Sequence, residues 1–189
     1  GVVLKPYPCA SASHTAIDAV LQLVQQYRIE AGQVESIRVG VTPVALQALP
    51  FSSPRTGWEA RSSLTYVVAV ALLRGQPLIE QFADHMVQDV EIREMMDRVA
   101  VEVTEASGPL TSRASTVTVA LSGGRRLHHR VEFARGRPEL PLDPEELDAK
   151  FLYCSRYILP PDHIEGAIER FRDLENVKDV TSLASILGG

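Results

Sequence analysis

The amino-acid sequence predicts an α+β fold, in which a small antiparallel sheet of about four strands packs against helices on one face. Apolar and polar residues alternate in four short segments, at residues 34–41, 98–104, 115–121 and 126–133. Apolar residues recur at helical spacing in most of the remaining chain. The connections, above all a Gly-Gly turn at residues 122–125, are typical of antiparallel neighbours.

The first helix is expected over residues 13–30, after a rigid extended segment. Pro6 and Pro8 fix their own φ angles and hold the preceding residues extended, so the chain cannot be helical before about Ser11. Gly32 is expected to end this helix. The apolar residues at helical spacing are Ile17, Val20, Leu21, Val24 and Tyr27.

A strand, a long loop and a buried helix are expected next. Residues 34–41 alternate as a strand, and residues 42–61 contain three prolines and the only tryptophan, which is typical of a long loop. Residues 62–73 are apolar nearly all round and end before Gly75, so they predict a buried helix. The inward side chains of the strand are expected to be Ile37, Val39 and Val41.

The middle of the chain is predicted to alternate between short helices and strands. Helical pieces are expected at residues 78–82 and 89–96, followed by the strand at residues 98–104. The Gly-Gly turn then joins residues 115–121 and 126–133 into a hairpin. The inward side chains of the strand at 98–104 are expected to be Val99, Val101 and Val103.

Three helices are expected to complete a single domain that covers residues 1–189. They lie at residues 143–153, 162–174 and 181–187. Asp143 followed by Pro144 is a favourable helix start, because the aspartate can cap the first turn and proline fits the first helical position.

Composition and charge exclude several classes of protein. The formal net charge of −5 argues against a nucleic-acid-binding protein. The longest apolar run, residues 66–73, is far shorter than the about 20 residues that a membrane helix needs. Two cysteines are too few for a disulfide framework, so we expect a cytoplasmic protein. His128 and His129 should point to opposite faces of a strand, so they cannot chelate one metal.

An uneven distribution of charge accompanies this composition. Residues 113–137 carry six arginines and a single acidic residue, Glu132. We interpret this arginine-rich stretch as a solvated hairpin or a subunit contact rather than a ligand site.

The charged and polar candidate residues suggest a binding site for a small polyacid rather than a complete active site. No catalytic triad, phosphate loop, dinucleotide fingerprint or metal-ligand spacing is present in the sequence. The N-terminus of a helix favours a bound anion. Positively charged side chains and hydrogen-bond donors lie near two predicted helix N-termini. The alternative is that Lys5 is solvated and His14 only caps its helix. The candidate residues are Lys5, His14, Arg61, Ser62 and Tyr66.

Two blocks of sequence, in this order, carry a resemblance to a known family. The first is Lys5-Pro6-Tyr7-Pro8-Cys9, with His14 and Ile17-Asp18 behind it. The second runs from Gly57-x-Glu59-Ala60-Arg61-Ser62-Ser63-Leu64-x-Tyr66 to Ala69-x-Ala71-Leu72-Leu73-x-Gly75. Together they resemble the carboxy-terminal part of the MmgE/PrpD family, which includes 2-methylcitrate dehydratase, cis-aconitate decarboxylase and iminodisuccinate epimerase.

The resemblance implies a small α+β lid domain, a site shared with an all-helical amino-terminal domain or subunit, and a homo-oligomer such as a dimer. It implies a lyase or isomerase that needs no cofactor or metal and acts on a small di- or tricarboxylic acid. This chain alone would hold half of such a site and be inactive. A non-catalytic assembly subunit that docks on a helical partner is the alternative.

The resemblance also implies roles for the candidate residues. Lys5, Arg61 and Ser62 would bind substrate carboxylates, and Tyr66 would donate a hydrogen bond or act as an acid. His14 would orient the substrate or transfer a proton. The decarboxylase branch has another histidine where Ala10 stands, so dehydration of the 2-methylcitrate type, a step of propionate catabolism, or epimerisation is expected ahead of decarboxylation.

Overall fold

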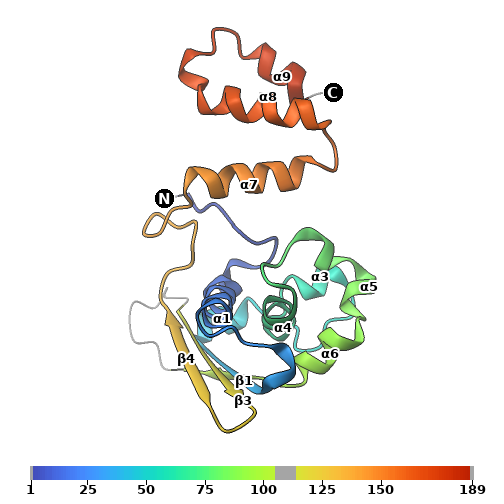
Figure 1. The fold of residues 1–189 in the computed structure, drawn as a ribbon, viewed down its shortest axis with the longest axis vertical. Coiled ribbons are helices and arrows are strands. Elements are labelled where there is room, and N and C mark those ends of the chain that lie inside the picture. The colour runs from blue at the N-terminus through green and yellow to red at the C-terminus, as the bar shows by residue number, and fades with distance from the viewer. Residues whose placement is uncertain (1, 105–113, 188–189) are drawn as a thin grey trace. The chain divides into compact units, whose positions relative to one another are not determined.

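A four-stranded sheet with helices on one face forms the larger part of the protein (Figure 1). The computed structural model describes residues 2–104 and 114–187, so Arg113 of the arginine-rich stretch lies outside the described residues. The chain divides into two compact units, Gly1–Pro141 and Leu142–Gly189, which are described separately.

The strands are β1 (Val34–Val41), β2 (Val99–Val103), β3 (Ser115–Leu121) and β4 (Arg126–Val131), in the order β2-β1-β3-β4. β1 and β4 both pair with β3 in antiparallel orientation, which confirms the α+β prediction. The pair of β1 and β2 is parallel, which the sequence analysis did not predict. The intervening segment holds several helices, enough for the crossover that parallel strands need, whereas apolar alternation carries no information on strand direction.

The inner face of the sheet follows the predicted alternation at its centre and departs from it at its edge. The three residues predicted to face inward on β1 have no exposed surface, which confirms the register of this strand. Val99 and Val101 are half-buried. The prediction for Val103 was wrong, because its side chain is 57% exposed at the end of the edge strand β2.

Helix α1 (His14–Tyr27) covers β3 and β4 and follows the 3-10 turn η1 (Ser11–Ser13). Its end differs from the prediction. Arg28, with φ at 51°, adopts the left-handed conformation and its N–H donates to the Val24 carbonyl. Gly32 instead lies in the separate 3-10 turn η2 (Ala31–Gln33).

Helix α4 (Leu64–Arg74) packs beside α1 and is the predicted buried helix (Figure 1). It begins after Ser63, whose hydroxyl accepts from the Tyr66 N–H at 3.3 Å. It ends at Gly75, as predicted, where φ is 78°.

The segment predicted as a long loop, residues 42–61, contains two short helices. α2 (Pro43–Gln47) and α3 (Gly57–Ala60) each begin after a threonine, Thr42 or Thr56, whose hydroxyl accepts a backbone N–H. Threonine caps of this kind stabilise one-turn helices that apolar periodicity cannot reveal.

Further short helices connect α4 to β2. They are η3 (Ile79–Phe82), α5 (Asp84–Val87) and α6 (Val90–Met96), of which the first and the last were predicted. The hairpin turn between β3 and β4 is also confirmed, with φ of 87° at Gly123 and 81° at Gly124.

The second unit consists of helices α7 (Pro144–Ser155), α8 (Pro161–Arg172), η4 (Leu174–Asn176) and α9 (Thr181–Leu187). Asp143 caps α7 as predicted: its carboxylate accepts the Glu146 N–H at 2.7 Å, and its own N–H donates to the Glu146 carboxylate at 3.1 Å. Across residues 2–104 and 114–187, no helix is both long and apolar enough to cross a membrane.

Candidate functional site

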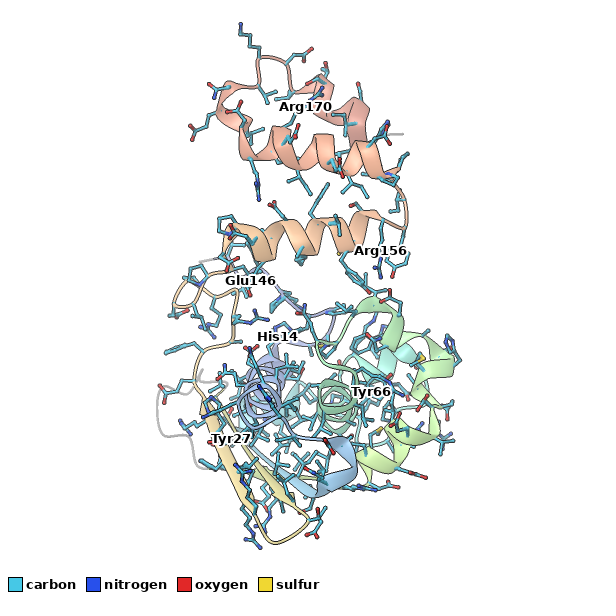
Figure 2. The ribbon with its side chains drawn as sticks, viewed as in Figure 1. His14, Tyr27, Tyr66, Glu146, Arg156 and Arg170 are labelled. Atoms are coloured by element: carbon cyan, nitrogen blue, oxygen red, sulfur yellow. The ribbon has the colours of Figure 1, made fainter. Side chains whose placement is uncertain are left out.

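Lys5 and His14 meet at one backbone carbonyl, that of Cys9. The Lys5 ammonium donates to the Cys9 oxygen at 3.3 Å, and His14 Nε2 lies 3.4 Å from the same oxygen. The prolines on either side of Tyr7 fix this bend, and His14 is the first residue of α1 (Figure 2). Lys5 is exposed, whereas His14 is 1% exposed. We call Lys5, Cys9 and His14 the Lys5–His14 cluster.

The head of α4 is tied to this cluster through the backbone. The Ala10 N–H donates to the Arg61 carbonyl at 2.8 Å. Arg61 is exposed and Ser62 is half-buried. One backbone hydrogen bond therefore joins the segment that carries Lys5 and His14 to the segment that carries Arg61 and Ser62.

The fifth candidate, Tyr66, is engaged elsewhere. Its side chain is fully buried, its hydroxyl donates to the Gln81 carbonyl, and its ring centre lies 5.9 Å from that of Phe82 (Figure 2). Burial first, and the negative charge of Asp89 second, raise the pKa of Tyr66 to about 12. The hydroxyl therefore stays protonated at neutral pH and donates to Gln81. The catalytic role that the resemblance implies stays a prediction, and the observed contact leads us to expect a structural role instead.

Replacement of Tyr66 by Phe separates the structural contact from a catalytic role. We expect the free energy of unfolding to fall by about 1 kcal/mol, because one buried hydrogen bond is lost. Turnover should stay within about threefold of wild type, because the hydroxyl is already donated to Gln81. Denaturant unfolding and steady-state kinetics measure the two effects. A loss of turnover above about tenfold in a folded variant would return Tyr66 to the reaction.

Cys9 contributes its backbone rather than its thiol. The thiol is buried, and its sulfur lies 3.5 Å from the Ser13 hydroxyl. Burial raises the pKa of the Cys9 thiol to about 11, although Ser13 and Lys5 act in the opposite direction. Because the thiolate is the nucleophile, a buried thiol with a raised pKa is a poor candidate for one, and we assign Cys9 no nucleophilic role.

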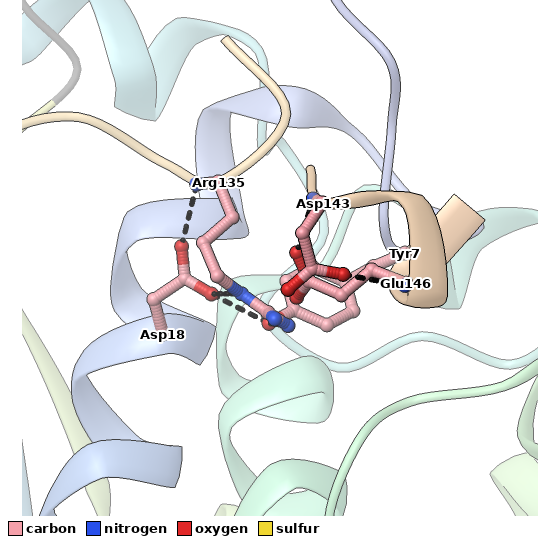
Figure 3. Close-up of polar contacts among 5 residues, drawn as sticks. All are labelled: Tyr7, Asp18, Arg135, Asp143 and Glu146. Carbon is pink, nitrogen blue, oxygen red and sulfur yellow. Dashed lines mark hydrogen bonds and ion pairs between the residues drawn. The ribbon is translucent and has the colours of Figure 1, made fainter. Parts of the chain in front are cut away.

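A buried polar network beside the cluster escaped the sequence analysis (Figure 3). The Tyr7 hydroxyl donates to the Asp18 carboxylate at 2.5 Å. Arg135, on the segment after β4, donates to the same carboxylate from its backbone at 3.1 Å and from Nε at 3.5 Å. Burial, then the charge of Asp18, raises the pKa of Tyr7 above its usual value. The one available signal was an aspartate on the buried side of the first helix.

The site has no metal-binding arrangement within the described part of the chain, where no three His, Cys, Asp or Glu side chains are grouped to hold an ion. The apolar hollow beside α4, lined by Leu46, Leu49, Phe51 and Leu64 among others, does not suit a polycarboxylate. The polar Lys5–His14 cluster is therefore the better candidate for binding an acid.

Comparison with known proteins supports a family assignment. The family model described as MmgE/PrpD C-terminal domain matches residues 7–176, which include His14 and Tyr66 and begin just after Lys5. The chain is 26% identical to the cis-aconitate decarboxylase of Mus musculus and 24% identical to that of Homo sapiens, over 100% of this chain in both cases. It is 20% identical, over 98% of its length, to a cis-aconitate decarboxylase-like protein of Aspergillus oryzae. The chain spans about 40% of the length of each of these relatives.

Proposed function

The chain belongs to the MmgE/PrpD family. On this premise we propose that it supplies the carboxylate-binding part of the active site of a lyase or isomerase. The substrate class is a small di- or tricarboxylic acid. The observation that carries the proposal is the Lys5–His14 cluster, in which an exposed ammonium and a buried imidazole are held at one carbonyl. The site is completed by the helical amino-terminal region of the family.

Lys5 supplies the charge that holds a substrate carboxylate. An ammonium has three N–H donors, of which the contact with Cys9 uses one. Charge-assisted hydrogen bonds to a carboxylate are about twice as strong as neutral ones. The contact with Cys9 also restrains a long, flexible side chain before substrate arrives, so less conformational entropy is lost on binding.

His14 acts by orientation in this proposal. Its imidazole is almost fully buried, and it contacts the same carbonyl as Lys5. It therefore fixes the bend that presents Lys5. Proton transfer by His14 is the alternative role, and it requires the substrate to reach an imidazole that this chain covers.

Arg61 and Ser62 extend the binding surface. Both lie between α3 and α4: Arg61 directly follows α3, and Ser62 follows it. The Arg61 carbonyl accepts the Ala10 N–H, and the Arg61 side chain is exposed. A second cation suits a substrate with more than one carboxylate, and a guanidinium can bind a carboxylate through two parallel hydrogen bonds.

The proposed reaction is dehydration of the 2-methylcitrate type. A base takes a proton from the carbon beside a carboxylate, the bond from the neighbouring carbon to its hydroxyl breaks, and a carbon–carbon double bond forms. An acid gives a proton to the departing hydroxyl, which leaves as water, so one water is released in each turnover. The helical amino-terminal region of the family supplies this base and this acid in the proposal. Cations that hold the carboxylates stabilise the charge that develops on them. We rank dehydration ahead of decarboxylation because the family resemblance implies a histidine in the decarboxylase branch at the position of Ala10.

Decarboxylation is the second candidate, because the relatives named above are cis-aconitate decarboxylases or resemble one. It breaks a carbon–carbon bond and releases CO2, which distinguishes it from dehydration. Both reactions use the same cationic surface.

A turnover panel tests the proposal. The chain is combined with the helical amino-terminal region of the family and given citrate, 2-methylcitrate and cis-aconitate, with product NMR and CO2 release as readouts. We expect an unsaturated acid from 2-methylcitrate without CO2, and no turnover by the chain alone. Release of CO2 from cis-aconitate would favour decarboxylation. Neither turnover nor binding of any acid would contradict the proposal and favour a non-catalytic assembly subunit.

A further inference from the structure

Asp18 is a buried carboxylate that collects donors from two distant parts of the chain. Its side chain is 2% exposed, and its oxygens accept from the Tyr7 hydroxyl and from the backbone and Nε of Arg135. Arg135 Nη2 in turn donates to the Tyr7 oxygen at 3.1 Å. Each of these three residues contacts the other two, and we call them the Asp18 network; they are among the residues drawn in Figure 3.

The Asp18 network reaches the Lys5–His14 cluster through Tyr7. The centre of the Tyr7 ring lies 5.1 Å from that of His14, with an angle of 79° between the planes, an edge-to-face contact. Tyr7 also lies between Lys5 and Cys9 in the chain, inside the bend that brings the ammonium to the carbonyl. The position of the Tyr7 side chain therefore affects both Lys5 and His14.

Arg135 is coupled to Lys5 from the other side. The residue after it, Gly136, accepts the Leu4 N–H at 2.9 Å through its carbonyl. The backbone on either side of Lys5 is thus restrained at Leu4 by the segment that carries Arg135, and at Tyr7 by the hydrogen bond of its hydroxyl to Asp18. Restraint at both points fixes the direction in which the Lys5 side chain leaves the backbone.

We propose that Asp18 and Arg135 are positioning residues of the polycarboxylate site, which hold Tyr7 and, through it, the Lys5–His14 cluster in its binding geometry. This inference rests on the proposed function of that cluster. Neither residue needs to contact the substrate. Displacement of the bend between Lys5 and Cys9 would move the ammonium and the imidazole together.

Stability alone is a weak reason for such a network. Burying the Asp18 carboxylate and much of the Arg135 side chain costs free energy that their attraction only partly returns. Apolar residues of similar volume often replace buried ion pairs without loss of stability. The Thr15–Ser115 contact shows a simpler way to tie α1 to the sheet, with two buried hydroxyls 2.8 Å apart. That pair joins α1 to β3 and provides a matched control.

The test compares Asp18→Asn, Arg135→Met and their combination with Ser115→Ala, in the chain assembled with the amino-terminal region. We expect each network variant to lower kcat/KM by about tenfold or more, and Ser115→Ala to stay within about threefold. The kcat/KM of the double variant should be no lower than that of the less active single variant, because the two substitutions disrupt one network. Additive losses, or wild-type kcat/KM in Asp18→Asn, would overturn the inference.

A readout independent of turnover keeps the two proposals distinguishable. The side-chain NMR signals of His14 should shift in Asp18→Asn and Arg135→Met and stay in place in Ser115→Ala. If no acid is turned over, the proposed function fails and these signals still decide the inference. Unchanged His14 signals in both network variants would overturn it. Should Asp18→Asn fail to fold, Arg135→Met, at a side chain that is 32% exposed, carries the test.

Discussion

Replacement of Lys5 by Met is expected to lower kcat/KM for the polycarboxylate substrate by about 10- to 100-fold, because one charge-assisted hydrogen bond is lost. Such bonds contribute about 1.5–3 kcal/mol, and each 1.4 kcal/mol corresponds to about a factor of ten. Methionine keeps most of the length of the side chain and removes its charge. Because Lys5 is exposed, the free energy of unfolding should change by less than about 0.5 kcal/mol.

Lys178→Met is the matched control, since Lys178 is an exposed lysine of the second unit. It removes the same charge from the chain and should leave kcat/KM within about twofold of wild type. Steady-state kinetics at several salt concentrations separate a direct contact from general attraction of the anion. Equal losses in the two variants would show that Lys5 acts only through net charge.

Replacement of Gly136 by Ala is expected to damage both stability and activity. Gly136 has φ at 83°, and an added Cβ would lie 1.8 Å from the Leu4 carbonyl oxygen, so the two segments cannot stay paired. Strain in the left-handed conformation and loss of the contact with Leu4 should lower the free energy of unfolding by about 2–4 kcal/mol. Turnover should fall by about tenfold or more, because Lys5 follows Leu4 in the chain.

The Gly124→Ala variant separates the backbone strain of a positive φ from the steric clash with Leu4. Gly124 has φ at 81°, and an added Cβ would have no neighbour within 4 Å. This variant should lose about 1 kcal/mol of unfolding free energy and keep its turnover. Denaturant unfolding and the same kinetic assay test both glycines. Wild-type turnover in a folded Gly136→Ala would contradict the role given to the pairing of Leu4 with Gly136.

The strands were predictable because alternation is a local signal. The range of β3 matches the prediction at both ends, and the buried face of β1 follows from Ile37, Val39 and Val41. Strand direction was not predictable, since the parallel pairing of β1 with β2 depends on the path of the intervening helices. Arg28, which ends α1 in the left-handed conformation, gives no sequence signal of the kind that glycine gives.

In the candidate site too, contacts between residues close in sequence were predictable and contacts between distant residues were not. Lys5 and His14 come from one short stretch, so their approach to the Cys9 carbonyl needs little more than two prolines and a helix start. The hydrogen bond of the Tyr66 hydroxyl depends on where the fold places the Gln81 carbonyl, which lies outside α4. Asp18 and Arg135 are separated by 117 residues, and the arginine lies in a stretch that we interpreted as a solvated hairpin or a subunit contact. Such a pairing becomes visible only in the fold.

The central claim is that a substrate carboxylate binds at the Lys5–His14 cluster, and lysine side-chain NMR tests it most directly. The chain contains three lysines, so Lys150 and Lys178 serve as internal references for Lys5 when the chain is labelled and the amino-terminal region is not. Titration with 2-methylcitrate is expected to shift the Lys5 and His14 signals with the same saturation curve and leave both reference lysines unchanged. Saturable binding or turnover without any movement of the Lys5 signal would contradict the account.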